Sequence, residues 1–299
     1  MNKKLFVFGL FWFSFCIAFS QNKGKNINDT WITPGFDFHI GGGIYLADKS
    51  TANFYNGAPD NEINLGSLLN NQYRFNEISL LVKNNYPYVD SMWLGDYPRN
   101  MQYKVGMNIS LGAKYKFNKN WGMCLNYSHV QLTANDVFLI MFDVLPGNQR
   151  NNYAIETISA TEERSFFELS VTRLFHVNPI LKPFVELGVH FNFLKVKSLN
   201  AIIEDQPFDL LSSVSTVYVP GQTTTPNYRT WSAPGYGANL TGGVKIVFNE
   251  TFSLDPAFTL SLSSLGHSDN VAGFYTGLTF NYIFMVRIVM SDLYFNKNK

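Results

Sequence analysis

Apolar and polar residues alternate along residues 102–117 with almost no error. One set of alternate positions is apolar or aromatic, from Tyr103 to Phe117. The other set is polar or glycine and includes Lys104, Lys114 and Lys116. Because successive strand side chains point to opposite faces, this pattern predicts a strand with one apolar and one polar face. The segment is also about three times the usual strand length, which suits a tilted strand between lipid and a polar lumen.

Seven further segments alternate in the same way and are predicted to be strands of the same kind. They are residues 36–46, 121–127, 164–175, 185–193, 236–248, 252–262 and 272–286. The alternation in the segment that starts at Trp121 slips near His129, which predicts a bulge or the membrane boundary at that point.

The connections between these segments alternate strictly between short and long. The short ones are residues 118–120, 176–181 and 249–251, and the longer ones are residues 47–101, 133–161, 198–234 and 264–271. Outer-membrane barrels have short periplasmic turns and long extracellular loops. We therefore predict an all-β, antiparallel up-and-down transmembrane barrel of eight strands over residues 36–287, located in the cell outer membrane. A soluble sandwich or lipocalin-like barrel would carry a polar outer face.

The first long connection leaves the strand number open. Residues 73–82 and 88–94 could add a pair of strands, which would give ten. Residues 78–82 do not alternate, however, so a folded extracellular hairpin or a short helix is favoured over a spanning pair.

Residues 1–20 are expected to be a secretory signal peptide. Lys3 and Lys4 precede an apolar stretch that is too short for a permanent membrane helix, and Ala18-Phe19-Ser20 forms a cleavage site before Gln21. Residues 21–35 would then be a periplasmic N-terminal segment, and residues 288–299 a periplasmic C-terminal tail.

Composition agrees with export to a membrane. Cleavage would remove Cys16 and leave Cys124 alone, so we expect no internal disulfide and no cysteine metal cluster. The net charge would fall from +1 to −1 with the loss of two lysines, which gives nucleic-acid binding no electrostatic support. Aromatic residues make up 16% and charged residues only 15% of the chain, as expected for a barrel with aromatic girdles.

The last predicted strand carries a resemblance to a known class. Residues 273–284, Gly-Phe-Tyr-Thr-Gly-Leu-Thr-Phe-Asn-Tyr-Ile-Phe, look like the terminal strand that the barrel-assembly machinery of Gram-negative bacteria recognises. With the eight-strand layout, the chain resembles small outer-membrane barrels of the OmpA/OmpW type. The Phe-Ser-Gln-Asn sequence at residues 19–22 resembles the signal junctions of Bacteroidota. The chain departs from the type because residues 285–299 continue past the terminal Phe284 and no peptidoglycan-binding domain follows.

The predicted lumen carries both signs of charge. An eight-stranded barrel leaves an interior just wide enough for side chains, so the simplest expectation is a paired network that plugs it. A gated or narrow pore lined by the same groups is the alternative. The inward-facing candidates are Asp37, His39, Lys104, Lys114, Glu168, Glu186, His190, Lys245 and Asp255.

Catalysis finds little support in the sequence. Glu186 with His190, and Asp37 with His39, could each supply the acid–imidazole half of a hydrolytic site. Lumen-facing pairs of this kind occur without catalysis, and no nucleophile elbow or metal-ligand spacing accompanies them. We therefore expect no catalytic residue, no cofactor and no bound metal.

The long connections contain candidates for partner contact. Exposed apolar runs of this size usually mark contacts, although this one could also fold over the barrel mouth or extend its strand. Large aromatics in the first connection suit protein or glycan contact. The candidates are Val137, Phe138, Leu139, Ile140, Met141, Phe142, Trp93 and Tyr97. In addition, Asp90-Ser91-Met92 is similar to the O-glycosylation sequon of Bacteroidota, which makes Ser91 a candidate acceptor.

The sequence thus favours a non-catalytic outer-membrane barrel that acts as an accessory or scaffold subunit of an envelope complex. Its partners would be outer-membrane lipid and membrane or lipoprotein subunits, and not nucleic acid. By fold analogy alone, candidate hosts are the type IX secretion and gliding apparatus and barrel-assembly or nutrient-uptake machinery. The alternative is a narrow pore or a small hydrophobic-ligand transporter of the OmpW kind.

Overall fold

The computed structural model describes residues 35–61, 63–144, 151–211, 232–249, 251–265 and 277–291. The predicted signal peptide, residues 21–34 of the N-terminal segment and residues 292–299 of the tail lie outside the described residues. So do residues 272–276 of the last predicted strand. Among the described residues, no helix is both long and apolar enough to cross a membrane.

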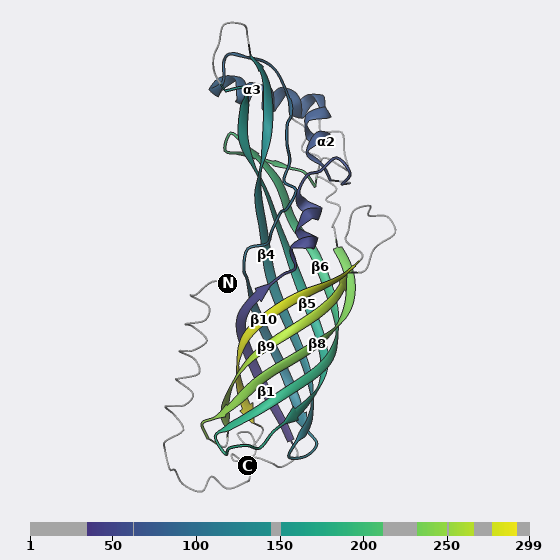
Figure 1. The fold of residues 1–299 in the computed structure, drawn as a ribbon, viewed down its shortest axis with the longest axis vertical. Helices are drawn as coiled ribbons and strands as arrows, with labels where there is room; N and C mark the ends of the chain where they lie inside the picture. Colours follow the sequence, from purple (N-terminus) through teal and green to yellow (C-terminus); the bar gives the residue numbers. More distant parts are fainter. Residues whose placement is uncertain are drawn as a thin grey trace, which may run out of the picture. The chain divides into compact units, whose positions relative to one another are not determined.

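Eight antiparallel strands form a closed ring, as predicted (Figure 1). Each strand pairs with the next strand of the ring, and the pairing of the first with the last closes the barrel. In chain order the ring consists of β1 (Gly35–Leu46), β3 (Gly106–Lys116), β4 (Trp121–Val144), β5 (Tyr153–Leu174), β6 (Leu181–Ile203), β8 (Ser232–Val247), β9 (Phe252–Leu265) and β10 (Leu278–Ser291). The ten-strand alternative is wrong, because β2 (Val89–Leu94) pairs only with the upper end of β4.

Two strand boundaries differ from the prediction. β3 begins at Gly106 and not at residue 102, because the chain before it joins β4 only through an isolated bridge between Tyr103 and Ala134. β10 continues to Ser291, which pairs with Asp37 of β1. The predicted start of the tail at residue 288 is therefore wrong.

Three neighbouring strands are much longer than the rest. β4, β5 and β6 contain 24, 22 and 23 residues, whereas β1 and β3 contain 12 and 11. The predicted loop at residues 133–161 is therefore wrong, because β4 and β5 pair from Trp121 and Arg173 up to Met141 and Tyr153. β6 likewise continues into the predicted loop at residues 198–234 and pairs there with β7 (Gln206–Asp209).

The long strands exchange the polarity of their two faces part-way along. On the lower part of β4, Leu125 is exposed and Asn126 is buried, whereas higher up Gln131 is exposed and Leu132 is buried. The ladder between β4 and β5 continues through this point without a register shift. The irregularity predicted near His129 is therefore the membrane boundary and not a bulge. Below it the outer face meets lipid, and above it the outer face meets water while the inner face packs on protein.

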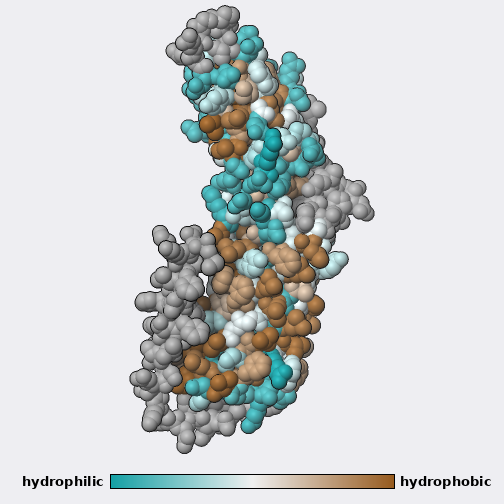
Figure 2. All heavy atoms as spheres, viewed as in Figure 1, coloured by the Kyte–Doolittle hydropathy of each residue, from teal (hydrophilic) through white to brown (hydrophobic). Residues whose placement is uncertain are grey.

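Apolar side chains cover most of the outer face of the lower part of the ring, which is largely brown in Figure 2. We call this surface the lipid-facing belt. Its side chains are exposed and apolar, as in Ile109 at 62% and Leu187 at 65%. Aromatic pairs lie near both edges of the belt, with Phe36 and Tyr115 at a centroid distance of 4.9 Å and Tyr127 and Phe167 at 5.0 Å. Such girdles mark the two membrane interfaces of transmembrane barrels.

Above the belt, the upper parts of β4, β5 and β6 form a sheet with β2 and β7, which we call the extension. The 3₁₀ helix η3 (Lys49–Tyr55) and the helices α2 (Leu65–Asn70) and α3 (Gln72–Asn85) belong to it (Figure 1). Asn64 and Asn71 cap α2 and α3 through their side-chain oxygens. Buried side chains from the helices and from the inner face of the sheet form one hydrophobic cluster. The expectation of a folded extracellular hairpin or short helix at residues 73–94 is confirmed by α3 and β2.

One buried carboxylate in the extension, that of Glu156, is expected to make its stability depend on pH. Burial and the nearby charges of Glu204 and Asp205 raise the pKa of Glu156 to about 7, although the Glu204 amide donates to its Oε2 at 3.2 Å. A carboxyl group whose pKa is higher in the folded protein than in the unfolded chain contributes stability at pH values below its unfolded pKa of 4.5. This contribution is lost as the pH rises from 4.5 to about 7.

Replacing Glu156 with glutamine is expected to stabilise the extension at pH 8, by at most about 3 kcal/mol, and to leave it unchanged at pH 4. Hydrogen exchange of the amides of β5 and β6 at both pH values measures this. An equal effect of E156Q at both pH values would contradict the assignment.

Candidate functional site

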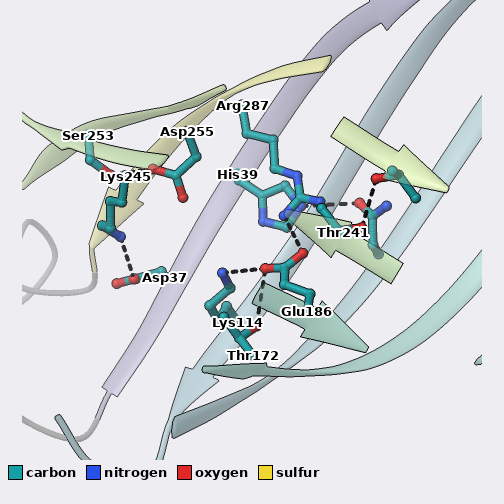
Figure 3. Close-up of polar contacts among 12 residues, drawn as sticks. Asp37, His39, Lys114, Thr172, Glu186, Thr241, Lys245, Ser253, Asp255 and Arg287 are labelled. Atoms are coloured by element: carbon teal, nitrogen blue, oxygen red, sulfur yellow. Dashed lines mark hydrogen bonds and ion pairs between the residues drawn. The ribbon is translucent and has the colours of Figure 1, made fainter. Parts of the chain in front are cut away.

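The barrel lumen contains most of the predicted charged residues, arranged in successive layers (Figure 3). At the periplasmic end, Asp37 on β1 is 1% exposed. Its carboxylate accepts Lys116 Nζ at 2.7 Å, Lys245 Nζ at 3.3 Å and Ser291 Oγ at 2.8 Å. Two cations and a hydroxyl from three other strands thus converge on one acid, which ties the lower ends of these strands together.

A second layer is centred on Glu186 of β6, which is also 1% exposed. Its two oxygens divide between two cations, with Lys114 Nζ at 2.7 Å on Oε1 and Arg287 at 2.7 Å on Oε2. Thr172 adds a hydrogen bond to Oε1 at 3.1 Å. Figure 3 shows these side chains pointing toward one another across the lumen from β3, β5, β6 and β10. Buried charges are tolerated when they are paired and hydrogen-bonded in this way.

The two lumenal histidines bind neutral polar groups. His39 Nε2 lies 3.1 Å from Asn126 Oδ1, and His190 Nε2 lies 3.0 Å from Ser263 Oγ. The His39 ring also fills the space above Gly112, where a Cβ would lie 2.6 Å from its Cε1 atom. Because Glu186 is engaged by Lys114 and Arg287, and His190 by Ser263, the first acid–imidazole half-site that the sequence offered is not assembled.

An apolar layer lies above the ionic ones. Tyr45 of β1 is fully buried, and its ring lies 5.8 Å from that of Phe166 on β5. Inward-facing side chains of β4 and β10 complete this cluster, whose buried members are Tyr45, Val130, Leu132, Phe166, Ile283 and Met285. Apart from the Tyr45 hydroxyl, this layer offers water and ions no polar partner, so it raises the free energy of an ion that enters it.

The outer mouth is covered by a buried polar cluster. Glu162 and Arg164 of β5 form an ion pair at 2.6 Å, and both are nearly inaccessible. The hydroxyl of Tyr103 donates to Glu162 at 3.0 Å, and that of Tyr55 donates to the same oxygen. Arg164 donates to Thr51 of η3 at 3.1 Å. The chain that follows β1 is therefore fastened across the top of the barrel.

The predicted lumen network is largely brought together, with one error. Asp37 lies with Lys245, and Glu186 lies with Lys114. Buried positions also hold His39, Glu168, His190 and Asp255. Lys104 is wrong, because it precedes β3 and its side chain is exposed above the barrel.

The sequence reasoning missed several residues that close the lumen. Arg287 lies just beyond the predicted strand 272–286, although its inward phase follows from Ile283 and Met285. Glu162 and Arg164 also alternate in phase with Glu168 of the same strand. That alternation was the available signal for them. Tyr55 comes from a non-strand segment and carries no such signal. Tyr103 belongs to the alternating segment 102–117, but its phase predicted a lipid-facing side chain, and this is wrong because its hydroxyl donates to Glu162.

The apolar run of the predicted second long loop divides between two faces of β4. Phe138, Ile140 and Phe142 are buried in the core of the extension, so their prediction as partner contacts is wrong. They serve the alternative role, in which the run extends its strand. Val137 is 52% exposed on the opposite face, and Leu139 and Met141 are half-buried there.

The first connection places its candidates at the edge strand. Trp93 is 48% exposed on β2, whereas Tyr97 is half-buried against the extension core. Ser91 is exposed and, with Asp90 and Lys83, lines a cavity of about 190 Å³ between α3 and β2. Its glycosylation remains a prediction.

Within the described ranges, no group of three or more His, Cys, Asp or Glu side chains could hold a metal ion. Cys124 is a free, buried cysteine that faces the lumen.

Comparison with known proteins gives remote likenesses only. The sequence matches no model of a known protein family, and it matches no curated protein. Among solved structures, Neisserial surface protein A aligns with a TM-score of 0.42 at 9% identity, over 86% of this chain and 96% of that one. OprG from Pseudomonas aeruginosa aligns at 0.35 and 14% identity, over 87% and 98%. Ail, the attachment invasion locus protein of Yersinia pestis, crystallised with the heparin analogue sucrose octasulfate, aligns at 0.33 and 9% identity, over 86% and 98%. Likenesses this remote concern the fold and carry nothing about function.

The closed ring and its apolar belt define the class of protein. The chain is an eight-stranded transmembrane β-barrel of the cell outer membrane. Within that class it combines a lumen filled by paired charges with a folded extension that has a hydrophobic core of its own.

Proposed function

We propose that this protein is a non-catalytic scaffold or accessory subunit of an envelope complex, in which the barrel is a membrane anchor and the extension is the binding platform. The observation that supports this most directly is the division of labour along β4, β5 and β6. Their lower parts enclose a lumen that is occupied by buried ion pairs, and their upper parts build a second folded body beyond the apolar belt.

The sealed lumen argues against transport. A permeating solute would have to break the Glu186 and Asp37 ion pairs, cross the apolar layer at Phe166, and then displace the cluster around Arg164. Removing one partner of a buried ion pair costs about 3–5 kcal/mol, so several such steps in series form a high barrier.

The extension argues for binding. Ordering a helix pair and three strand extensions costs conformational entropy that a simple membrane anchor would not need to pay. Surface-exposed segments held on a rigid scaffold are the usual carriers of recognition. By fold analogy, the candidate host complexes are the type IX secretion and gliding apparatus and the barrel-assembly machinery.

The competing proposal is a narrow pore or hydrophobic-ligand conduit of the OmpW kind, and electrical recording separates the two. The purified barrel, inserted into planar lipid bilayers, is expected to show no steady conductance steps. Protease accessibility of the extension on vesicles from the same preparation controls for correct insertion. Reproducible steps from inserted, folded protein would overturn the sealed-anchor proposal.

Partner recovery tests the platform itself. The intact protein is extracted gently from its native membrane, and the proteins that co-purify with it are identified. The variant Leu187→Ile, which is altered only in the lipid belt, is extracted in the same way for comparison. Specific proteins that co-purify with both forms and are lost after proteolytic removal of the extension would support the proposal. Recovery of a bare barrel under every extraction condition would count against it.

A further inference from the structure

The outer face of the extension carries an apolar surface that is separate from the lipid belt. Strand register places its side chains in adjacent rows, with Trp93 beside Met141 and Met141 beside Tyr153, and with Leu139 beside Ile155 in the next row. Val137 follows on the same face of β4. We call these six residues the apolar face: Trp93, Val137, Leu139, Met141, Tyr153 and Ile155.

These side chains are accessible. Ile155 is 62% exposed, Val137 52%, Trp93 48% and Tyr153 40%. Buried residues of the helices belong to the same core cluster as Phe138 and Ile140, which lie on the opposite face of the sheet. A contiguous apolar surface on a water-exposed sheet usually marks a contact site.

A polar zone separates the apolar face from the membrane. Below Val137 on the same face come Asn135 beside Ser159, then Thr133 beside Thr161, then Gln131 beside Glu163. Glu163 pairs with Lys197 of β6 at 3.1 Å. Figure 2 shows brown surface near the upper end, separated by a mostly teal zone from the brown belt on the barrel. The apolar face therefore does not belong to the lipid contact.

Position restricts what can cover this face. It lies on the outward side of strands whose lower parts face lipid, so an occupant must approach sideways, parallel to the membrane. Val137 lies ten positions after Tyr127, which belongs to the aromatic girdle. At about 3.3 Å per residue this places the apolar face about 30 Å along the strand beyond the membrane interface. A partner must present apolar surface at that same height.

A second copy of this chain meets that requirement by construction. All copies insert with the same orientation, so a two-fold axis along the membrane normal brings identical apolar faces together at equal height. Such an interface is isologous, the commonest kind in homo-oligomers. None of the six side chains is charged, so two identical faces meet without like-charge repulsion. We infer that the apolar face is the contact through which two copies of this protein associate side by side in the membrane.

The inference rests on the proposed platform role of the same sheet and names its occupant. The test uses the full chain in intact outer membranes. Ile155→Cys is treated with a short bismaleimide, and Leu80→Cys is the matched control. Leu80 is 68% exposed on α3, on the opposite side of the extension. The native Cys124 is buried in the lumen and gives no background.

The expected result is a cross-linked product of twice the chain mass with I155C and only monomer with L80C. In lipid nanodiscs, Ile155→Glu is expected to weaken self-association at least about tenfold, because it places two like charges at the contact. Ser159→Glu, on the same face of the same strand but in the polar zone, should change it far less. Heat-modifiable gel mobility verifies folding of each variant.

Three outcomes would overturn the inference. They are an I155C protein that stays monomeric in intact membranes, an I155C protein that cross-links to a different polypeptide, and an I155E dimer as stable as the wild type. The second outcome would leave the platform proposal standing. Conductance by the barrel would remove the sealed-anchor proposal without touching the dimer, so the two can fail separately.

Discussion

Replacing Glu186 with glutamine is expected to lower the free energy of unfolding of the barrel by about 3–5 kcal/mol. Glu186 is the only acid bound by Lys114 and Arg287 at 2.7 Å among the described contacts, and all three side chains lie inside the lumen. The neutral amide leaves two buried cations without their counter-charge. Urea-dependent folding into lipid vesicles, followed by tryptophan fluorescence, measures the change.

The same substitution at a surface ion pair provides the control. Glu163 pairs with Lys197 at 3.1 Å, but their side chains are 26% and 43% exposed. Surface pairs of this kind contribute at most about 1 kcal/mol. E163Q should therefore be nearly neutral. Equal destabilisation by E186Q and E163Q would show that the lumenal network does not hold the barrel together.

Truncating Phe138 to alanine is expected to unfold the extension while the barrel stays intact. Phe138 is 2% exposed in the extension core, and loss of a buried phenylalanine costs about 3–5 kcal/mol. The transmembrane parts of β4 and β5 keep their own ladder and lumenal contacts, so the loss is confined to the region above the membrane. Protease added to the outer side should then release the extension and leave a protected barrel fragment.

Val137→Ala is the matched control, since Val137 is the preceding residue and is 52% exposed on the opposite face of β4. It should leave the cleavage rate of the extension close to that of the wild type. If F138A instead destroys the heat-modifiable mobility of the barrel, then the two bodies fold as one cooperative unit, contrary to the expectation.

The alternating pattern was sufficient for the membrane part of the fold. A fixed environment on each side, lipid outside and polar groups inside, makes the period of two visible in the sequence. The rule fails where the environment changes. Val130 and Leu132 point inward, as Asn126 does, but they are apolar because they pack on protein above the lumen. If the end of β4 is placed where apolar residues stop on its outer face, the strand ends too early, near His129.

The lumenal site could be predicted only in part, for a related reason. Asp37 and Glu186 were recognisable as buried acids because alternation gives the phase of each strand. Which cation each acid binds depends on the relative stagger of strands far apart in the sequence, which no local pattern encodes. The cluster around Arg164 was beyond reach because Tyr55 lies on a segment without a period, and the period around Tyr103 predicts a side chain that faces lipid.

The unbroken ladder of β4 and β5 has a mechanical consequence. It runs from Trp121 to Met141 with no register shift, and thus passes from the bilayer to the far part of the extension without a hinge. A sideways or pulling load on the extension would act along hydrogen-bonded strands and be spread over the barrel wall. We therefore expect the extension to stay rigidly aligned with the barrel strands under load.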